Sequence, residues 1–249
     1  MVNGFLYSKK YNYMALYSSK CGCSSIRYLF LELHKNELNN KQQVYDRHTI
    51  KTLFEPPKSI DTNKIKKYLV IRNPYLRVVS MFTSKYIGEN NLLKRKFRKN
   101  NINCEGNSFL FFLLALKYIK DKGILNNVDC HIAEQTNKLE FPLSNNIEVI
   151  KLENFDTGIT NFYFKNFKNT ELFSKYKNIH DSPNNFLHSN KTTTNNSYGI
   201  TDTSKIEFTN TLNIPTYINF YVDPVIKQLV DYIYHDDFVK LGYKKELPF

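Results

Sequence analysis

The sequence has no tryptophan, few cysteines and no long hydrophobic run. The four cysteines, at positions 21, 23, 104 and 130, are too irregularly spaced for a disulfide framework. No apolar run reaches the roughly 18 residues that a membrane helix needs, and Phe109–Leu116 is the longest. The N-terminus shows no apolar core of a signal peptide. We therefore expect a soluble, cytoplasmic protein without a membrane span.

Acidic residues are also scarce relative to basic ones. The chain has 35 Lys and Arg against 23 Asp and Glu, a net charge of +12 that favours an anionic ligand or partner. Abundant Asn, Lys, Tyr and Ile are typical of an AT-rich genome, so composition explains part of this charge. Only Phe97 interrupts the cations of Lys94–Lys99. Such a run is usually a solvated face, but it could guide an anionic glycan. Nucleic acid is not expected, because no base-reading motif is present.

Strand and helix patterns alternate along the chain. A length of 249 residues with 41% hydrophobic residues suits one packed domain, residues 1–249. The alternation predicts an α/β fold with a central parallel sheet flanked by helices on both faces. Residues 88–107 are expected to be a polar, basic insertion. We expect strands at 13–18, 67–72 and 147–152, and helices at 24–34, 74–86, 107–121, 153–167 and 224–234.

Two segments read as a strand that enters a turn and then a helix, Tyr17–Ile26 and Leu69–Ser80. Each places a cation and hydroxyl groups near a helix N-terminus, which favours a phosphate-like anion. Two such junctions suggest a ligand with two anionic groups. A zinc site at Cys21 and Cys23 is disfavoured, because the spacing is tight and no second cysteine pair follows. We expect no metal.

A nucleotide hydrolase or kinase is the main rival for such a junction. Its phosphate loop needs the pattern Gly-x-x-x-x-Gly-Lys-Ser/Thr, in which the lysine follows the glycines. Here Lys20 precedes the turn and the loop is shorter. The order of residues therefore disfavours that class.

Both junctions resemble motifs of the sulfotransferases that use 3′-phosphoadenosine 5′-phosphosulfate (PAPS), closest to the carbohydrate branch. Ser19–Ser25 resembles the motif Pro-Lys-x-Gly/Ala-Cys/Ser-Thr-Ser, with serine in place of the usual proline. Ile71–Ser80 resembles Val-Arg-Asn/Asp-Pro-Tyr-x-Arg-Leu-Val-Ser almost completely. Weaker echoes follow in the family's order at Asp129–Gln135, Lys151–Phe155 and Tyr234–Tyr243. The resemblance implies a P-loop-like sulfotransferase architecture.

The resemblance also implies roles for individual residues. Lys20 would neutralise the departing phosphate, Ser24 and Ser25 would cradle the 5′-phosphate, and Arg72 and Ser80 would bind the 3′-phosphate. Lys191 would add a phosphate contact from a closing loop, unless that loop is simply solvated. The residues assigned to PAPS and its product adenosine 3′,5′-bisphosphate are Lys20, Cys21, Gly22, Cys23, Ser24, Ser25, Arg72, Ser80 and Lys191.

The acceptor hydroxyl needs a general base, and histidines are the main candidates. His48 is favoured, while His131 with Gln135 is placed nearer the acceptor and Glu134 is a fallback. An isolated histidine is as often a purely structural residue. Arg77 either supports Ser80 or forms an ordinary ion pair on a helix surface.

The function expected from this resemblance is transfer of a sulfuryl group from PAPS to a carbohydrate hydroxyl by in-line displacement. The acceptor would be an anionic or neutral glycan. One alternative is a catalytically degenerate relative that binds a nucleotide or polyanion, because Ser19 replaces the motif's proline. Another is transfer to a tyrosine, a lipid or a small alcohol. The oligomeric state is not readable from the sequence.

Overall fold

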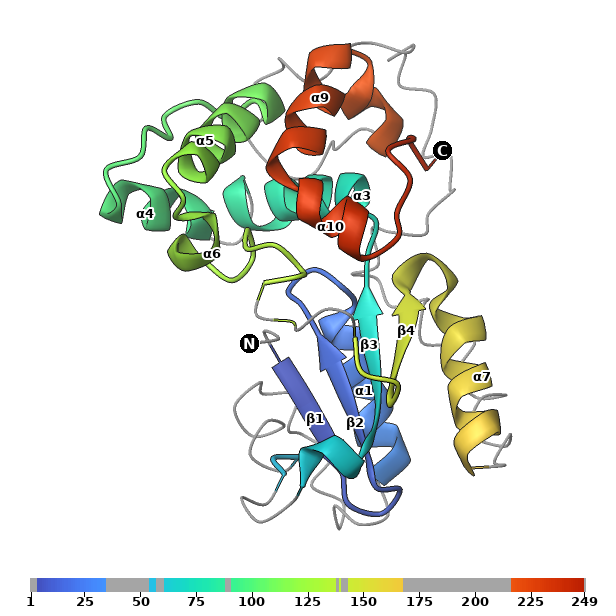
Figure 1. The fold of residues 1–249 in the computed structure, drawn as a ribbon. Coiled ribbons are helices and arrows are strands. Elements are labelled where there is room, and N and C mark those ends of the chain that lie inside the picture. Colours follow the sequence, from blue (N-terminus) through green and yellow to red (C-terminus); the bar gives the residue numbers. More distant parts are fainter. Residues whose placement is uncertain are drawn as a thin grey trace. The chain divides into compact units, whose positions relative to one another are not determined.

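The structure, a computed structural model, describes residues 4–34, 54–56, 61–87, 91–137, 139, 143–167 and 216–248 (Figure 1). The chain divides into two compact units. The sheet unit comprises Val2–Ile71 and Glu140–Asn196, and the helical unit comprises Arg72–Leu139 and Ser197–Phe249. The expectation of one domain over residues 1–249 stays a prediction.

The sheet unit contains a four-stranded sheet of order β1-β2-β3-β4. β2, β3 and β4 are parallel, which confirms the predicted α/β class. β1 was not predicted, and it pairs antiparallel with β2 at the edge of the sheet. Asn12 in the turn between them has a φ of 47°, a left-handed conformation that asparagine tolerates. The strands are β1 (Gly4–Ser8), β2 (Tyr13–Tyr17), β3 (Lys66–Ile71) and β4 (Ile147–Lys151).

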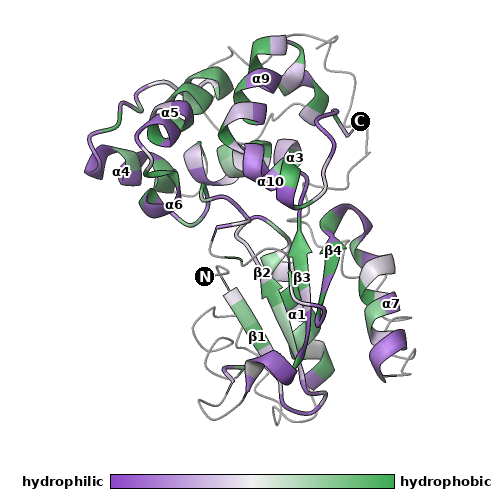
Figure 2. Ribbon diagram, in the orientation of Figure 1, coloured by the Kyte–Doolittle hydropathy of each residue, from purple (hydrophilic) through white to green (hydrophobic). Residues whose placement is uncertain are grey.

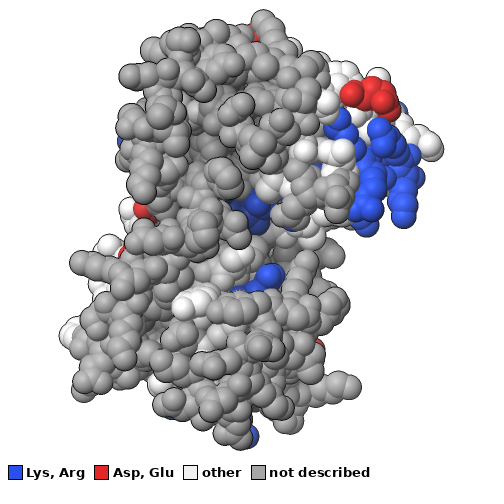
Figure 3. Space-filling view, turned by 180° about the vertical axis from the view of Figure 1, so that it is seen from behind, with Lys and Arg blue, Asp and Glu red and all other residues white. Residues whose placement is uncertain are grey.

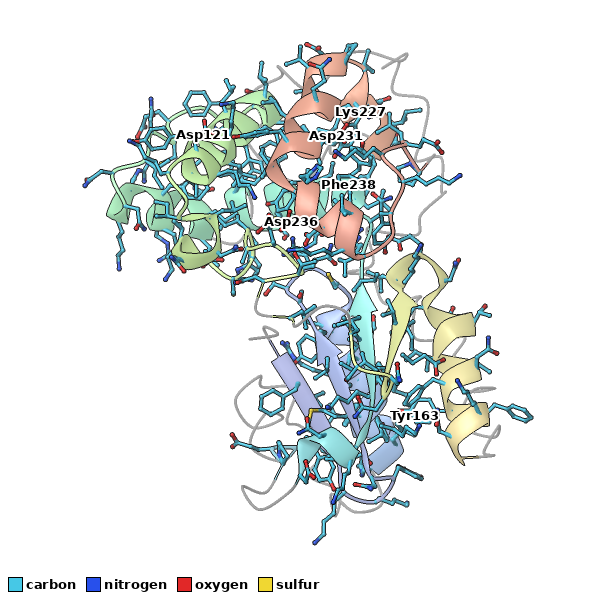
Figure 4. All side chains as sticks on the ribbon, in the orientation of Figure 1. Asp121, Tyr163, Lys227, Asp231, Asp236 and Phe238 are labelled. Carbon is cyan, nitrogen blue, oxygen red and sulfur yellow. The ribbon has the colours of Figure 1, made fainter. Side chains whose placement is uncertain are left out.

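Alternate strand residues face two helices, α1 (Cys23–His34) and α7 (Phe155–Phe167). Tyr13, Tyr68 and Ile150 pack there with the apolar stripes of both helices, and Figure 2 shows β2 and β3 as largely hydrophobic. Short 3₁₀ turns, Thr62–Lys64 and Leu152–Asn154, precede β3 and α7 respectively. The Tyr13 hydroxyl is hydrogen-bonded to that of Tyr163, which Figure 4 labels on α7.

The helical unit packs aromatic residues between its helices. Phe82, Phe109, Phe112 and Phe220 contribute fully buried rings to one cluster. The helical elements are α3 (Pro74–Met81), a π-helical turn (Phe82–Tyr86), α4 (Leu92–Lys99), α5 (Phe109–Asp121), α6 (Leu125–Val128), a 3₁₀ turn (Tyr217–Tyr221), α9 (Pro224–Ile233) and α10 (His235–Lys240). Within the described residues, no helix is long and apolar enough to cross a membrane.

Side-chain hydrogen bonds tie α9 to its neighbours in this unit. Asp231 pairs with Lys227 one turn earlier at 2.8 Å and also accepts a hydrogen bond from the Tyr75 hydroxyl on α3. The Tyr232 hydroxyl donates to Asp121 on α5 at 2.7 Å. Figure 4 labels Asp121, Lys227 and Asp231 on these helices.

The predicted basic insertion contains the helix α4. Lys94 is buried, and its ammonium group donates to the Asn107 side chain and lies 4.9 Å from the centre of the Tyr86 ring. The remaining cations of the helix are exposed, and Figure 3 shows a cluster of basic side chains there. The exposed cations, which we name the α4 basic face, are Arg95, Lys96, Arg98 and Lys99.

The close approach of α7 to β4 gives a stability prediction. A Cβ atom on Gly158 would lie 2.6 Å from Cγ2 of Ile150. Alanine gains about 1 kcal/mol of helix propensity, but overpacking costs about 1–3 kcal/mol. We expect Gly158→Ala to lower the free energy of unfolding by about 1 kcal/mol in urea titrations.

A double-mutant cycle tests the cause. Ile150→Ala removes the methyl group that the new Cβ would meet, so Gly158→Ala should cost less in that background. Equal costs in both backgrounds would show that the contact with Ile150 is not responsible.

Candidate functional site

The first junction is a tight turn between β2 and α1. The Cys21 N–H donates to the Ser18 carbonyl at 3.2 Å, and Lys20 and Gly22 have φ values of 67° and 76°. Gly22 is required twice over, because its φ is left-handed and a Cβ would lie 2.7 Å from Cδ1 of Leu152. The sequence therefore places glycine where both the turn and the packing demand it.

Lys20 adopts the same left-handed conformation without the freedom of glycine. A residue with a Cβ pays about 1–2 kcal/mol for that conformation. Strained backbone of this kind persists where the surroundings or the function demand it. The turn therefore keeps a long cationic side chain at a position where glycine would have less backbone strain. This favours a functional role for the Lys20 ammonium group.

The cysteines of the first junction bond to the turn itself. The Cys23 thiol donates to the Ser18 carbonyl at 3.3 Å, and the buried Cys21 thiol donates to the Ser19 carbonyl at 3.7 Å. All four cysteines of the chain are free thiols. These contacts give Cys21 and Cys23 a structural part in shaping the turn.

The start of α1 suits an anion. N–H groups in the first turn of a helix have no carbonyl partner within the helix, and they carry a partial positive charge. The first turn of α1 contains no acidic side chain. Ser24 is exposed and Ser25 is partly buried, so hydroxyl groups stand at the same helix end.

The second junction lies in the helical unit, where Arg72 follows β3 and α3 begins. The Asn73 side chain accepts a hydrogen bond from the Tyr75 N–H at 2.9 Å, and Pro74 occupies the first helical position. Arg72 is buried, and the side-chain amide of Gln135 bonds its N–H and its carbonyl, each at 2.8 Å. The Asn73 cap thus fixes the start of α3. The Arg72 backbone is held in place by Gln135, which is distant in the sequence.

Arg77 does not lie on the helix surface, which is one of the two positions expected from the sequence. Its side chain is fully buried and donates to the carbonyl oxygens of His131 at 3.2 Å and Ala133 at 2.7 Å. One of its nitrogens also lies 3.7 Å from the buried Asp237 carboxylate. The expectation of a surface ion pair was therefore wrong, because the guanidinium points into the core instead of toward solvent.

His131 is hydrogen-bonded to Asp129, two residues earlier. The His131 backbone N–H and its Nδ1 lie 2.8 and 2.6 Å from the same Asp129 oxygen. A proton on Nδ1 that is donated to Asp129 leaves Nε2 as the acceptor of the ring. His131 and Asp129 therefore have the arrangement of an oriented histidine base.

The electrostatics of this pair favour a more basic imidazole. Burial opposes protonation of His131, but the hydrogen bonds to Asp129 and Cys130 outweigh it and raise the pKa of His131. Burial likewise opposes ionisation of Asp129, yet the bonds to His131 outweigh that effect and lower its pKa. The two shifts share one cause, the hydrogen bond between the two side chains.

Metal binding at this pair is a poorer explanation of the geometry. Asp129, Cys130 and His131 each have a ligand atom within 4.8 Å of the others. However, Nδ1 is already directed at the Asp129 carboxylate. The hydrogen bond accounts for the cluster without an ion.

Glu134 is poorly placed as the fallback base. One carboxylate oxygen accepts from Lys120 at 2.6 Å, and the other accepts from the Asn126 side chain at 3.0 Å. Both oxygens are therefore engaged by neighbouring donors, which weakens Glu134 as a proton acceptor.

A protein-family model described as the sulfotransferase family matches residues 3–244. The chain belongs to the sulfotransferase family. It is therefore a transferase, and sulfuryl transfer is the activity that membership supports. No curated protein and no solved structure gives a significant match to the chain.

Most of the predicted site residues lie in the two strand-to-helix junctions. Lys20–Ser25 form one turn and helix start. Arg72 precedes α3 and Ser80 lies near the end of α3, and both are buried. His48 and Lys191 lie outside the described residues, so their roles stay predictions. Sequence reasoning missed Asp129 as the partner of His131, although both lie in one motif segment.

The strain at Lys20 gives a prediction. Lys20→Gly relieves the left-handed strain and Lys20→Ala does not, so the glycine variant should be more stable by about 1 kcal/mol. Urea titration of the two variants measures this difference. Lys20→Arg serves as the charged control, because it keeps both the Cβ and the cation. A glycine variant no more stable than the alanine variant would remove strain as an argument for Lys20.

Proposed function

We propose that this sulfotransferase moves a sulfuryl group from PAPS to a hydroxyl of a carbohydrate. The observation that carries the proposal is the pair of strand-to-helix junctions, at Lys20 and at Arg72, in a chain of the sulfotransferase family. A nucleotide with phosphates on its 3′ and 5′ sides has an anion for each junction.

The residues of the first junction fit the 5′ side of PAPS. PAPS supplies the sulfuryl group together with a phosphate leaving group. Sulfuryl transfer resembles phosphoryl transfer, in which positioning and electrostatic stabilisation do most of the catalytic work. Lys20 neutralises negative charge that develops on the leaving phosphate. The first-turn N–H groups of α1, with the hydroxyls of Ser24 and Ser25, hold the 5′-phosphate.

The residues of the second junction are assigned to the 3′-phosphate. Arg72 offers a planar, permanently charged donor, and Ser80 offers a hydroxyl. Burial strengthens charge-assisted hydrogen bonds to a phosphate, and both residues are buried. None of these roles requires a metal ion.

His131 is our choice for the general base, since its Nε2 is the proton acceptor and Asp129 orients the ring. In this role Nε2 takes the proton of the acceptor hydroxyl as that oxygen attacks sulfur. The raised pKa of His131 makes the ring a stronger base. His48, the first candidate from the sequence, stays a prediction.

The α4 basic face favours an anionic acceptor among the glycans. Its cations are exposed, and only Arg98 forms an ion pair within the described residues, with Glu105 at 3.7 Å. Lys96 is also among the charges that lower the pKa of Asp129, after the larger contributions of burial and of His131. Sulfated or uronic-acid glycans present dense negative charge to such a surface.

Titration calorimetry with adenosine 3′,5′-bisphosphate tests the donor site. We expect saturable binding to the purified protein, weakened at least about tenfold by Arg72→Ala, which removes a charge-assisted contact. No binding to the wild type would contradict the proposal. Binding without sulfate transfer to any glycan of a neutral and anionic panel would instead support a catalytically degenerate relative.

The acid limb of the pH profile tests His131. Its pKa is raised above the ordinary value of about 6.5, and the neutral ring is the active form. We therefore expect kcat/KM to rise with pH through a limb above about 6.5. Asp129→Asn removes the main raising interaction and should move the limb to lower pH. An unchanged limb in that variant would exclude His131 as the base.

A further inference from the structure

One buried carboxylate in the helical unit has more partners than an ordinary ion pair provides. Asp237 on α10 is fully buried. One oxygen accepts from the Thr136 N–H at 2.9 Å and its hydroxyl at 3.0 Å, while the other accepts from the Gln135 N–H at 3.0 Å. Arg77 supplies the positive charge at 3.7 Å. Asp237 thus holds residues 135 and 136 by their backbone.

These partners are needed together, because a buried charge is tolerated only when it is paired and hydrogen-bonded. Burial raises the pKa of Asp237, whereas Arg77 and the two backbone N–H groups oppose that shift. Loss of any one donor leaves part of a carboxylate unsatisfied in the core. The conformation of residues 135 and 136 is therefore strongly constrained.

From this carboxylate one branch reaches Arg72. The side-chain amide of Gln135 donates to the Arg72 carbonyl and accepts from its N–H, each at 2.8 Å. Both polar groups of one residue are thereby held by one side chain, as a neighbouring strand would hold them. Arg72 stands just beyond the end of β3, and the four strands of the sheet place no other strand residue opposite it.

A second branch reaches His131. Arg77 is paired with Asp237 and donates from its other terminal nitrogen to the carbonyls of His131 and Ala133. The Tyr234 hydroxyl donates to the carbonyl of Ile132 at 3.0 Å, so three consecutive carbonyls are bonded from the core. The backbone of residues 131–133, which carries the His131 imidazole, is therefore held by hydrogen bonds from the Arg77 and Tyr234 side chains.

We propose that Asp237, Gln135 and Arg77 are positioning residues that fix Arg72 and His131 from one buried charge. The proposal rests on the proposed function for the roles of Arg72 and His131. Beyond that function, it assigns a separate role to each of the two branches, which we call the division of labour. The Gln135 branch serves the donor phosphate, and the Arg77 branch serves the base.

The Gln135 branch is tested by Gln135→Met, which keeps the length of the side chain but removes both hydrogen bonds to Arg72, together with the longer one from Nε2 to Asp237 at 3.4 Å. We expect the Kd for adenosine 3′,5′-bisphosphate and the KM for PAPS to rise at least about tenfold, with the acceptor KM unchanged. Tyr86→Phe is the matched control. It removes a buried hydroxyl that donates to the Gly106 carbonyl at 2.8 Å, away from both branches. The control should lower Tm but leave both constants unchanged.

The Arg77 branch is tested by Arg77→Lys, which keeps the charge but loses the planar fork that serves the carbonyls. We expect kcat to fall at least about tenfold and the acid limb of the pH profile to shift. The Kd for adenosine 3′,5′-bisphosphate should stay within about twofold of the wild type, because the Gln135 clamp is intact. Equal changes of both constants in both variants would overturn the division of labour and indicate general loosening.

Amide hydrogen exchange keeps the proposal testable apart from catalysis. The Arg72 N–H should exchange much faster in Gln135→Met than in the wild type, and unchanged exchange would overturn the clamp. If Gln135→Met does not fold, Gln135→Asn keeps a neutral amide on a side chain one methylene shorter, which draws it away from Arg72, and is measured in the same way. Failure of the wild type to bind adenosine 3′,5′-bisphosphate would refute the proposed function, while the exchange result would still decide whether the clamp exists.

Discussion

The burial of the Asp237 carboxylate is the constraint on which the helical unit depends. A carboxylate in a core is stable only with several donors, and breaking such a buried pair costs about 3–5 kcal/mol. Its donors come from Arg77 and from the adjacent residues Gln135 and Thr136, which lie far from Arg77 and from Asp237 in the sequence. The unit can therefore close only when the segment after β3, the segment around His131 and the last helix have met. The need to satisfy the Asp237 carboxylate explains why the polar residues Arg77, Gln135 and Thr136 are buried in this unit.

Both junctions place a cation next to the start of a helix, but different local structures produce them. The first uses left-handed backbone at Lys20 and Gly22, together with thiol-to-carbonyl bonds, to turn sharply from strand to helix. The second relies on the Asn73 cap and on Pro74, whose fixed φ suits the first turn of a helix. Strain is stored in the first junction, whereas the second is built from favourable local geometry. Substitutions in the first are therefore expected to reveal trade-offs between stability and activity.

Much of the fold followed from sequence, because local patterns decided it. The helix from Pro74 and the strand before it were predicted from an apolar run, a cap and a proline, and the family match supports the sulfotransferase resemblance. β1 was missed, since its pairing depends on a turn at Asn12 and not on alternation. The expected surface position of Arg77 was wrong because its burial depends on Asp237, a carboxylate about 160 residues later in the chain. Helical periodicity carries no information about so distant a partner. The orientation of His131 required the position of Asp129 in space.

The π-helical turn that follows α3 has a geometric consequence for the core. Val78, Phe82 and Tyr86 are four residues apart and all fully buried. In a straight α-helix, residues at this spacing rotate about 40° around the axis at each step, because each residue turns about 100°. The wider turn over Phe82–Tyr86, marked by the bond from the Ile87 N–H to the Phe82 carbonyl at 3.1 Å, takes up part of that rotation. One extra residue in the turn thus offsets the rotation, and the rings of both Phe82 and Tyr86 contact the α5 ring of Phe112.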